Sequence, residues 1–171
     1  MSWRSRIPKQ FQEPVDNALA WAKGLLESGN TVPARFFVGN SDTGELFEVT
    51  IDTVDPDGRA RAVHQARLLA AMHHADFVVS VIEAWALPAK DMPRHSDILE
   101  QYGSLAAYPG RQDVLAVQLE THEGIFSLQA PIRPKPPSKK KRVLAEVVLL
   151  QADAAVGQLA NVLPAPPESL H

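Results

Sequence analysis

The chain has 171 residues, with 17 lysines and arginines against 20 acids, 14 prolines and no cysteine. A chain of this length buries about two-thirds of its unfolded surface, so one hydrophobic core suffices without a metal or disulfide. The lack of cysteine excludes disulfides, thiol catalysis and thiolate metal sites. The composition, 45% hydrophobic and 22% charged, excludes a largely disordered or collagen-like chain. We expect one domain over residues 1–171, with flexible termini at 1–12 and 164–171.

We expect neither a secretion signal nor a membrane-spanning run. Its first six residues are basic but lack the apolar stretch that a secretion signal needs. The most apolar run, 77–87, is interrupted by Ser80 and Glu83 and is too short to cross a bilayer. We therefore expect a soluble, cytoplasmic protein that makes no membrane contact.

The first half of the chain predicts two helices on either side of a β-hairpin. Apolar residues at helical spacing, with a proline in the first turn, predict a helix over 14–28. Turn-forming residues at 40–44 and alternation after them predict a hairpin over 34–52. Asp55 is placed as an N-cap before Pro56, which predicts a helix over 56–74.

The second half of the chain is rich in predicted strands. It predicts, in order, a strand over 77–87, an irregular stretch over 88–110 with a short helix at 97–102, a hairpin of strands 112–120 and 125–132, a strand over 143–150, and a final helix over 152–163. The run 77–87 is apolar on both faces, which is typical of the middle of a sheet covered by helices. We therefore predict an α+β fold: an antiparallel or mixed sheet of about six strands with about three helices packed on it.

Two short patterns carry a resemblance to a protein family. A strand ends in Glu83-Ala84-Trp85, and a later strand begins with Pro109-Gly110-Arg111-Gln112-Asp113-Val114. This succession, over about residues 76–133, resembles small uncharacterised bacterial proteins in which a Glu-Ala-Trp strand end precedes a Pro-x-Arg-x-Asp/Glu-Val strand. The resemblance implies a compact α+β fold in a bacterial protein and transfers no catalytic residue.

Glu83 is the weak catalytic candidate. On a strand it shares a face with residues that are predicted to be core, namely Val79, Val81, Trp85 and Leu87. A carboxylate in such surroundings needs a partner or has a raised pKa. It is either the general acid/base or metal ligand of a small enzyme completed by the 88–110 loop, or half of a structural ion pair with Arg111 or Arg133. A carboxylate open to solvent beside a second titrating group favours catalysis, whereas a closed pair favours structure.

His73, His74 and Asp76 are weak candidates for a metal site. Imidazoles and a carboxylate are zinc ligands. However, neighbouring residues on a helix diverge by about 100°, which keeps His73 and His74 from converging on one ion. A cation close to a helix C-terminus is a structural alternative. We expect no cofactor.

The segment 133–142 is the most unusual stretch of the sequence. It holds six of the 17 cations and no acid, which leaves 11 cations against 20 acids and a charge of -9 in the rest of the chain. The candidate contacts of this segment are Lys135, Lys139, Lys140, Lys141 and Arg142. They form either a contact to nucleic-acid phosphates or another anion, or a solvated loop attracted to the acidic body. The segment has no aromatic residue for base stacking, which favours the solvated loop.

No complete catalytic constellation is present in the sequence. It contains no Gly-x-Ser-x-Gly elbow, phosphate-binding loop or His-Glu-x-x-His pattern. A long loop and exposed hairpins favour a non-enzymatic binding or assembly module that forms a homodimer. The alternatives are a protein that contacts nucleic acid through 133–142 and a small enzyme centred on Glu83.

Overall fold

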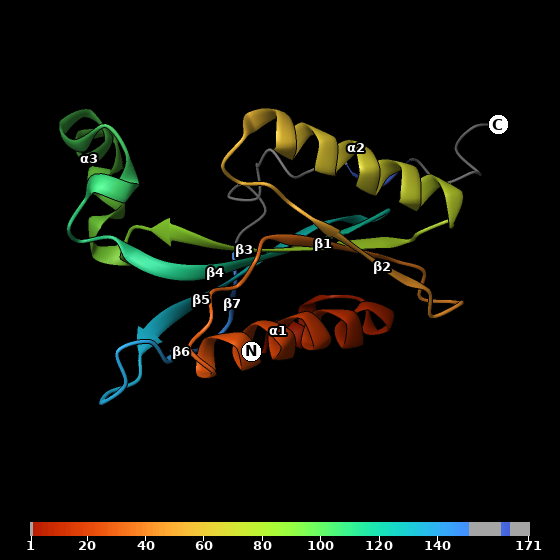
Figure 1. Cartoon of the computed structure of the whole chain (residues 1–171), viewed down its shortest axis with the longest axis horizontal. Helices are drawn as coiled ribbons and strands as arrows, with labels where there is room; N and C mark the ends of the chain where they lie inside the picture. Colours follow the sequence, from red (N-terminus) through yellow and green to blue (C-terminus); the bar gives the residue numbers. More distant parts are fainter. Residues whose placement is uncertain (1, 151–161, 165–171) are drawn as a thin grey trace.

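The computed structural model describes residues 2–150 and 162–164 and contains one antiparallel sheet (Figure 1). The strands are β1 (Arg35–Gly39), β2 (Leu46–Thr50), β3 (Phe77–Ala86), β4 (Gln112–Thr121), β5 (Gly124–Pro134), β6 (Arg142–Leu144) and β7 (Val148–Leu149). The helices are α1 (Gln12–Glu27), α2 (Pro56–Met72) and α3 (His95–Tyr102). The strand order is β2-β1-β3-β4-β5-β6, with β7 also paired to β5, and every pairing is antiparallel. The predicted α+β fold is confirmed.

One helix covers each face of the sheet (Figure 1). Alternate residues of β1 and β3 contribute to two separate cores, because neighbouring residues of a strand point to opposite faces of the sheet. Phe37 and its partner Val79 join the core under α1, while Phe36 and Val78 join the core under α2. Helix α1 contacts β3 and β6, whereas α2 contacts β1 and β2. The two helices are therefore offset, and no helix of residues 2–150 lies over the α1 face of β2.

Helix α2 starts as predicted and packs through small residues. The Asp55 carboxylate accepts the Asp57 N–H at 3.1 Å, and Pro56 is the first helical residue. The face toward the sheet is made of Gly58, Ala62, Ala66 and Ala70, all buried. Side chains this small bring the helix close to β1 and β2, so the interface has little space for a larger residue.

The N-terminal segment differs from the expected flexible terminus. Residues 3–6 and 9–11 form two 3-10 turns, and Trp3, Ile7 and Phe11 are buried in the α1 core. The Phe11 ring lies 5.7 Å from the Phe77 ring. The expectation for residues 1–12 therefore needs correction over 2–12, because apolar side chains every four residues anchor this segment against the sheet.

Two expectations about strands are also wrong. Trp85, expected in the core, is 50% exposed, because β3 extends beyond the part of the sheet that α1 covers. The strand expected over 143–150 is two short strands, β6 and β7, interrupted at residues 145–147.

Two expectations about the end of the chain fall mostly outside the described residues. The final helix is expected over 152–163, of which 152–161 are not described, and the flexible terminus is expected over 164–171, of which 165–171 are not described. Val162 is not helical and is buried in the α2 core.

Replacing Ala66 with leucine tests the close approach of α2 to the sheet. Ala66 is fully buried, so three extra heavy atoms have no space, and we expect the free energy of unfolding to fall by about 1–3 kcal/mol. The matched control is Ala60→Leu on the exposed face of the same helix, with an expected change within about 0.5 kcal/mol. Urea unfolding followed by circular dichroism measures both. Equal stabilities for the two variants would contradict the close packing.

Candidate functional site

Glu83 lies in a closed ion pair. Its Oε1 is 2.8 Å from Nη1 of Arg142, and its Oε2 accepts the Val32 N–H at 2.8 Å. Both charged side chains are about three-quarters buried, at 23% and 26% exposure. The partner is therefore Arg142 rather than the predicted Arg111 or Arg133. The pair joins β3 to β6 and to the segment entering β1, which is the arrangement that favours a structural role.

The stretch between β3 and β4, expected to complete an enzyme around Glu83, uses its own buried carboxylate. The Tyr108 hydroxyl donates to Asp91 at 3.0 Å, and Asp91 is 7% exposed. Burial raises the pKa of the Tyr108 hydroxyl, and the hydrogen bond to Asp91 raises it further. This hydrogen bond joins the beginning of the stretch between β3 and β4 to its end.

His73, His74 and Asp76 each have a structural role at the end of α2. The His73 Nδ1 is 3.2 Å from a carboxylate oxygen of Glu45, and its ring is stacked on Phe47 with the centroids 4.1 Å apart. His74 takes the left-handed conformation after the helix, with φ of 52°. The Asp76 carboxylate accepts both the N–H and the hydroxyl of Ser41. Within residues 2–150 and 162–164, no three His, Asp or Glu side chains are grouped to hold a metal ion.

The basic segment 133–142 forms the turn between β5 and β6, and we call it the basic finger. The Lys135 N–H donates to the Lys141 carbonyl at 3.1 Å, and the Ser138 hydroxyl accepts the Lys141 N–H at 3.0 Å. Arg142 is committed to Glu83. Lys140 lies against Gly29, the residue that follows the end of α1. This contact is made by the Cβ and the backbone of Lys140, and the residue is exposed.

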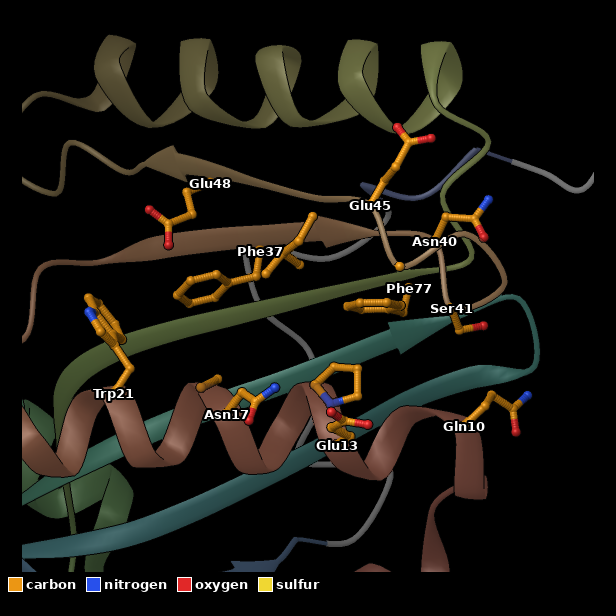
Figure 2. Close-up of a pocket in the computed structure, with 14 residues that line it drawn as sticks. Gln10, Glu13, Asn17, Trp21, Phe37, Asn40, Ser41, Glu45, Glu48 and Phe77 are labelled. Atoms are coloured by element: carbon orange, nitrogen blue, oxygen red, sulfur yellow. The ribbon is translucent and has the colours of Figure 1, made fainter.

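A groove between α1 and the β1–β2 hairpin is the best-formed candidate site, with a volume of about 370 Å³ (Figure 2). The groove exists because α1 leaves the adjacent face of β2 uncovered. Its floor is aromatic: the rings of Phe37 and Phe77 are buried, and Trp21 lies edge-on to Phe37 at 5.4 Å. Gly39 makes this floor possible, because the Phe77 ring occupies the place that a Cβ at residue 39 would take.

Among the described residues, the lining of the groove includes three carboxylates and no lysine, arginine or histidine. Glu45 turns toward His73, away from α1, as Figure 2 shows. Glu48 is 3.0 Å from Nη1 of Arg35, whose guanidinium carbon lies 5.1 Å from the centre of the Trp21 ring. Glu13 makes no ion pair within the described part of the chain. The groove therefore has one uncommitted carboxylate and an aromatic wall that already attracts a cation.

Sequence reasoning missed this groove, although a signal was present. Gln10, Glu13, Asn17 and Trp21 recur every three or four residues beside the apolar stripe of α1. They form a polar and aromatic border that faces the groove (Figure 2). That border becomes a site only beside the uncovered face of β2, and the offset of the two helices cannot be read from the α1 sequence.

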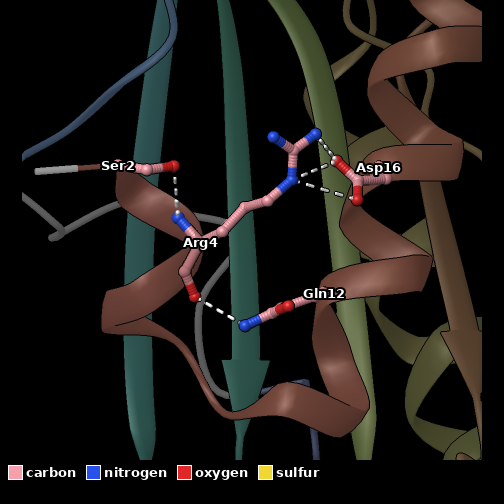
Figure 3. A network of polar contacts seen from close by, with 4 residues as sticks. All are labelled: Ser2, Arg4, Gln12 and Asp16. Atoms are coloured by element: carbon pink, nitrogen blue, oxygen red, sulfur yellow. Dashed lines mark hydrogen bonds and ion pairs between the residues drawn. The ribbon is translucent and has the colours of Figure 1, made fainter.

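A second, larger cavity lies on the other side of α1, against β6 and β7. Its strongest polar groups pair with each other: the Arg4 guanidinium contacts the Asp16 carboxylate at 2.5 Å (Figure 3). This hydrogen bond and the charge of Asp16 raise the pKa of Arg4. The Arg4 carbonyl also accepts the Gln12 side-chain amide at 2.7 Å. The pairing fastens the N-terminal segment to α1. Three other charged residues of this lining, Arg6, Lys23 and Glu146, make no ion pair within the described residues, but they are of mixed sign, unlike the lining of the groove.

Comparison with protein-family models, with curated proteins and with solved structures found no match to this chain. In the described ranges, no helix is both long and apolar enough to span a bilayer. The residues that line the groove are therefore what indicates its function.

Replacing Glu83 with glutamine tests the closed ion pair. The change leaves Arg142 partly buried without its carboxylate, and we expect a loss of about 1–3 kcal/mol in the free energy of unfolding. Arg61→Gln removes half of the exposed pair with Asp55 and serves as the matched control, with an expected change within about 0.5 kcal/mol. A wild-type unfolding curve for Glu83→Gln would show that the pair does not stabilise the fold.

Proposed function

We propose that this protein is a non-enzymatic binding module whose groove between α1 and β2 takes a cationic ligand, such as the arginine or lysine side chain of an extended segment. The observation that carries the proposal is the lining of the groove: an aromatic floor with carboxylates and no cation. Aromatic faces attract guanidinium and ammonium groups, and nearby carboxylates add to the attraction. The groove is thus complementary to a positive charge on an apolar stem.

Arg35 supports the cation preference from within the chain. Its guanidinium lies over Trp21 and is paired with Glu48, so one cation already occupies the end of the aromatic wall. Glu13 and Asn17, closer to the N-terminus of α1, are exposed and remain open to a second cation. A carboxylate and an aromatic floor, the kinds of group that hold Arg35, therefore also line the part of the groove next to Glu13.

The arrangement gives less support to an enzyme. Glu83 is used by Arg142 and Val32, and Asp91 is used by Tyr108. A general acid/base needs a proton-exchanging group within reach of the ligand, and two of the carboxylates that line the groove face cationic partners instead: Glu45 faces His73, and Glu48 faces Arg35. Binding without chemistry is the simpler function for such a lining.

A contact to nucleic acid is the second candidate, and one observation favours it. Trp85 is half exposed, with the Arg111 guanidinium 5.8 Å from its ring, at the end of the sheet where the basic finger begins. An aromatic face beside cations is a stacking site for an unpaired base. Yet Arg142 is committed to Glu83, which reduces the charge available to phosphates.

Titration with Nα-acetyl-arginine amide tests the groove. About 15 heavy atoms at about -0.3 kcal/mol each give about -4.5 kcal/mol, a dissociation constant near 1 mM. We expect amide chemical shifts in NMR spectra to change at Asn17, Ser41 and their neighbours in the groove. Glu13→Gln should weaken binding about fivefold, since one charge pair near water contributes about 1 kcal/mol.

Two controls accompany this titration. Glu100→Gln, an exposed change on α3, should leave the affinity unchanged. Nα-acetyl-glutamate amide should not bind, because its charge has the sign of the lining. Equal shifts with both amides, or shifts scattered over the surface, would contradict a cation site.

Salt dependence tests the nucleic-acid candidate. We expect only weak binding of a single-stranded oligonucleotide at low salt, lost at about 150 mM where the screening length is about 8 Å. The measurement is fluorescence anisotropy, with Lys139, Lys140 and Lys141 replaced together by alanine as the matched variant. Submicromolar affinity at about 150 mM salt, with a log–log slope that the variant lowers by about two to three units, would place nucleic-acid binding first.

A further inference from the structure

The basic finger has the composition that the groove fits. It combines three prolines with six cations and no acid, and its residues 133–137 and 139–141 are exposed. Proline-rich segments bind in aromatic-lined grooves, and flanking cations pair with acids at the border of such grooves. One chain thus carries both a basic, proline-rich projection and an aromatic groove lined with carboxylates.

The finger is also ordered by hydrogen bonds within its own residues. Its base is closed by the backbone hydrogen bond from Lys135 to Lys141, and the Ser138 hydroxyl accepts two further N–H groups, those of Lys140 and Lys141. A segment that is already ordered loses little conformational entropy when it docks. Arg142 is committed to Glu83, and the other five cations of the finger make no ion pair within the described residues: Arg133, Lys135, Lys139, Lys140 and Lys141.

The finger cannot fill the groove of its own chain. The groove borders β2 at one edge of the sheet, whereas the finger joins β5 to β6 at the other edge (Figure 1). Along α1, the finger lies beside Gly29, and the groove extends from Trp21 to Pro14, which are about 12 and about 22 Å away at 1.5 Å per residue. A hairpin closed at Lys135 and Lys141 extends only about 10 Å past that pair.

We infer that the ligand of the groove is the basic finger of a second copy of this chain, so that two copies related by a two-fold axis exchange fingers. This inference rests on the proposed function. A contact between two different surfaces closes into a dimer only when both copies make it at once, and the two-fold arrangement provides two finger–groove contacts. The charge of -9 outside the finger also attracts the finger of the partner.

Charge reversal tests the exchange by analytical ultracentrifugation. Wild-type protein should form a dimer that weakens as salt rises. Glu13→Lys places a cation in the groove and Lys139→Glu an acid on the finger, and each variant alone should raise the dimer dissociation constant at least tenfold. An equimolar mixture should dimerise again, because one contact is then wild-type and the other has both charges reversed.

Three checks make the outcome unambiguous. Lys90→Glu, an exposed change with the same effect on net charge, should dimerise like wild type. If Glu13→Lys does not fold, Asn17→Arg supplies the groove variant. A monomeric wild-type protein at low salt would overturn the inference, as would reversal variants that do not rescue each other, or a finger that binds oligonucleotide while the protein stays monomeric. If arginine amide still binds the groove of a monomer, the proposed function stands and only the exchange fails.

Discussion

The offset between the two helices is the constraint on which the rest of the structure depends. A sheet that is apolar on both faces at β1 and β3 must be covered twice, and α1 and α2 do this over different strands. The small residues of α2 bring it down onto β1 and β2, where Val49 is buried beneath it. Because α1 lies over β3 and β6 instead, β2 is covered on one face only, and the groove occupies the space beside it.

The sequence was informative where one element decides its own structure. Alternation of polar and apolar residues, turn residues and the Asp55 N-cap predict the hairpins and α2 because these signals act over a few residues. The sequence was uninformative where the burial of a side chain depends on which other element packs against its face of the sheet. Trp85 continues the apolar face of β3, yet it is exposed because α1 does not extend that far. The partner of Glu83 likewise required knowing that β6 returns beside α1.

Some charged residues of this protein hold structural elements together, whereas others make no ion pair. This difference decides which of them are available to a partner. The basic finger looks like an independent patch in the sequence, but its base is structural: Arg142 closes the pair with Glu83, and Lys140 lies at the end of α1. The other five cations of the finger make no ion pair within the described residues. The carboxylates of the groove divide in the same way, since Glu45 and Glu48 hold neighbouring elements and Glu13 does not.

This division between structural and uncommitted charge favours recognition over catalysis. A catalytic carboxylate works because its surroundings shift its pKa or expose it to a reacting group. Here the buried carboxylates accept hydrogen bonds that satisfy them, and the uncommitted one, Glu13, is exposed on α1 beside aromatic rings. A carboxylate in that position stabilises a bound cation through charge while the rings contact its apolar stem. Gly39 keeps the Phe77 ring in the floor, so the site is preformed by the same backbone that builds the sheet.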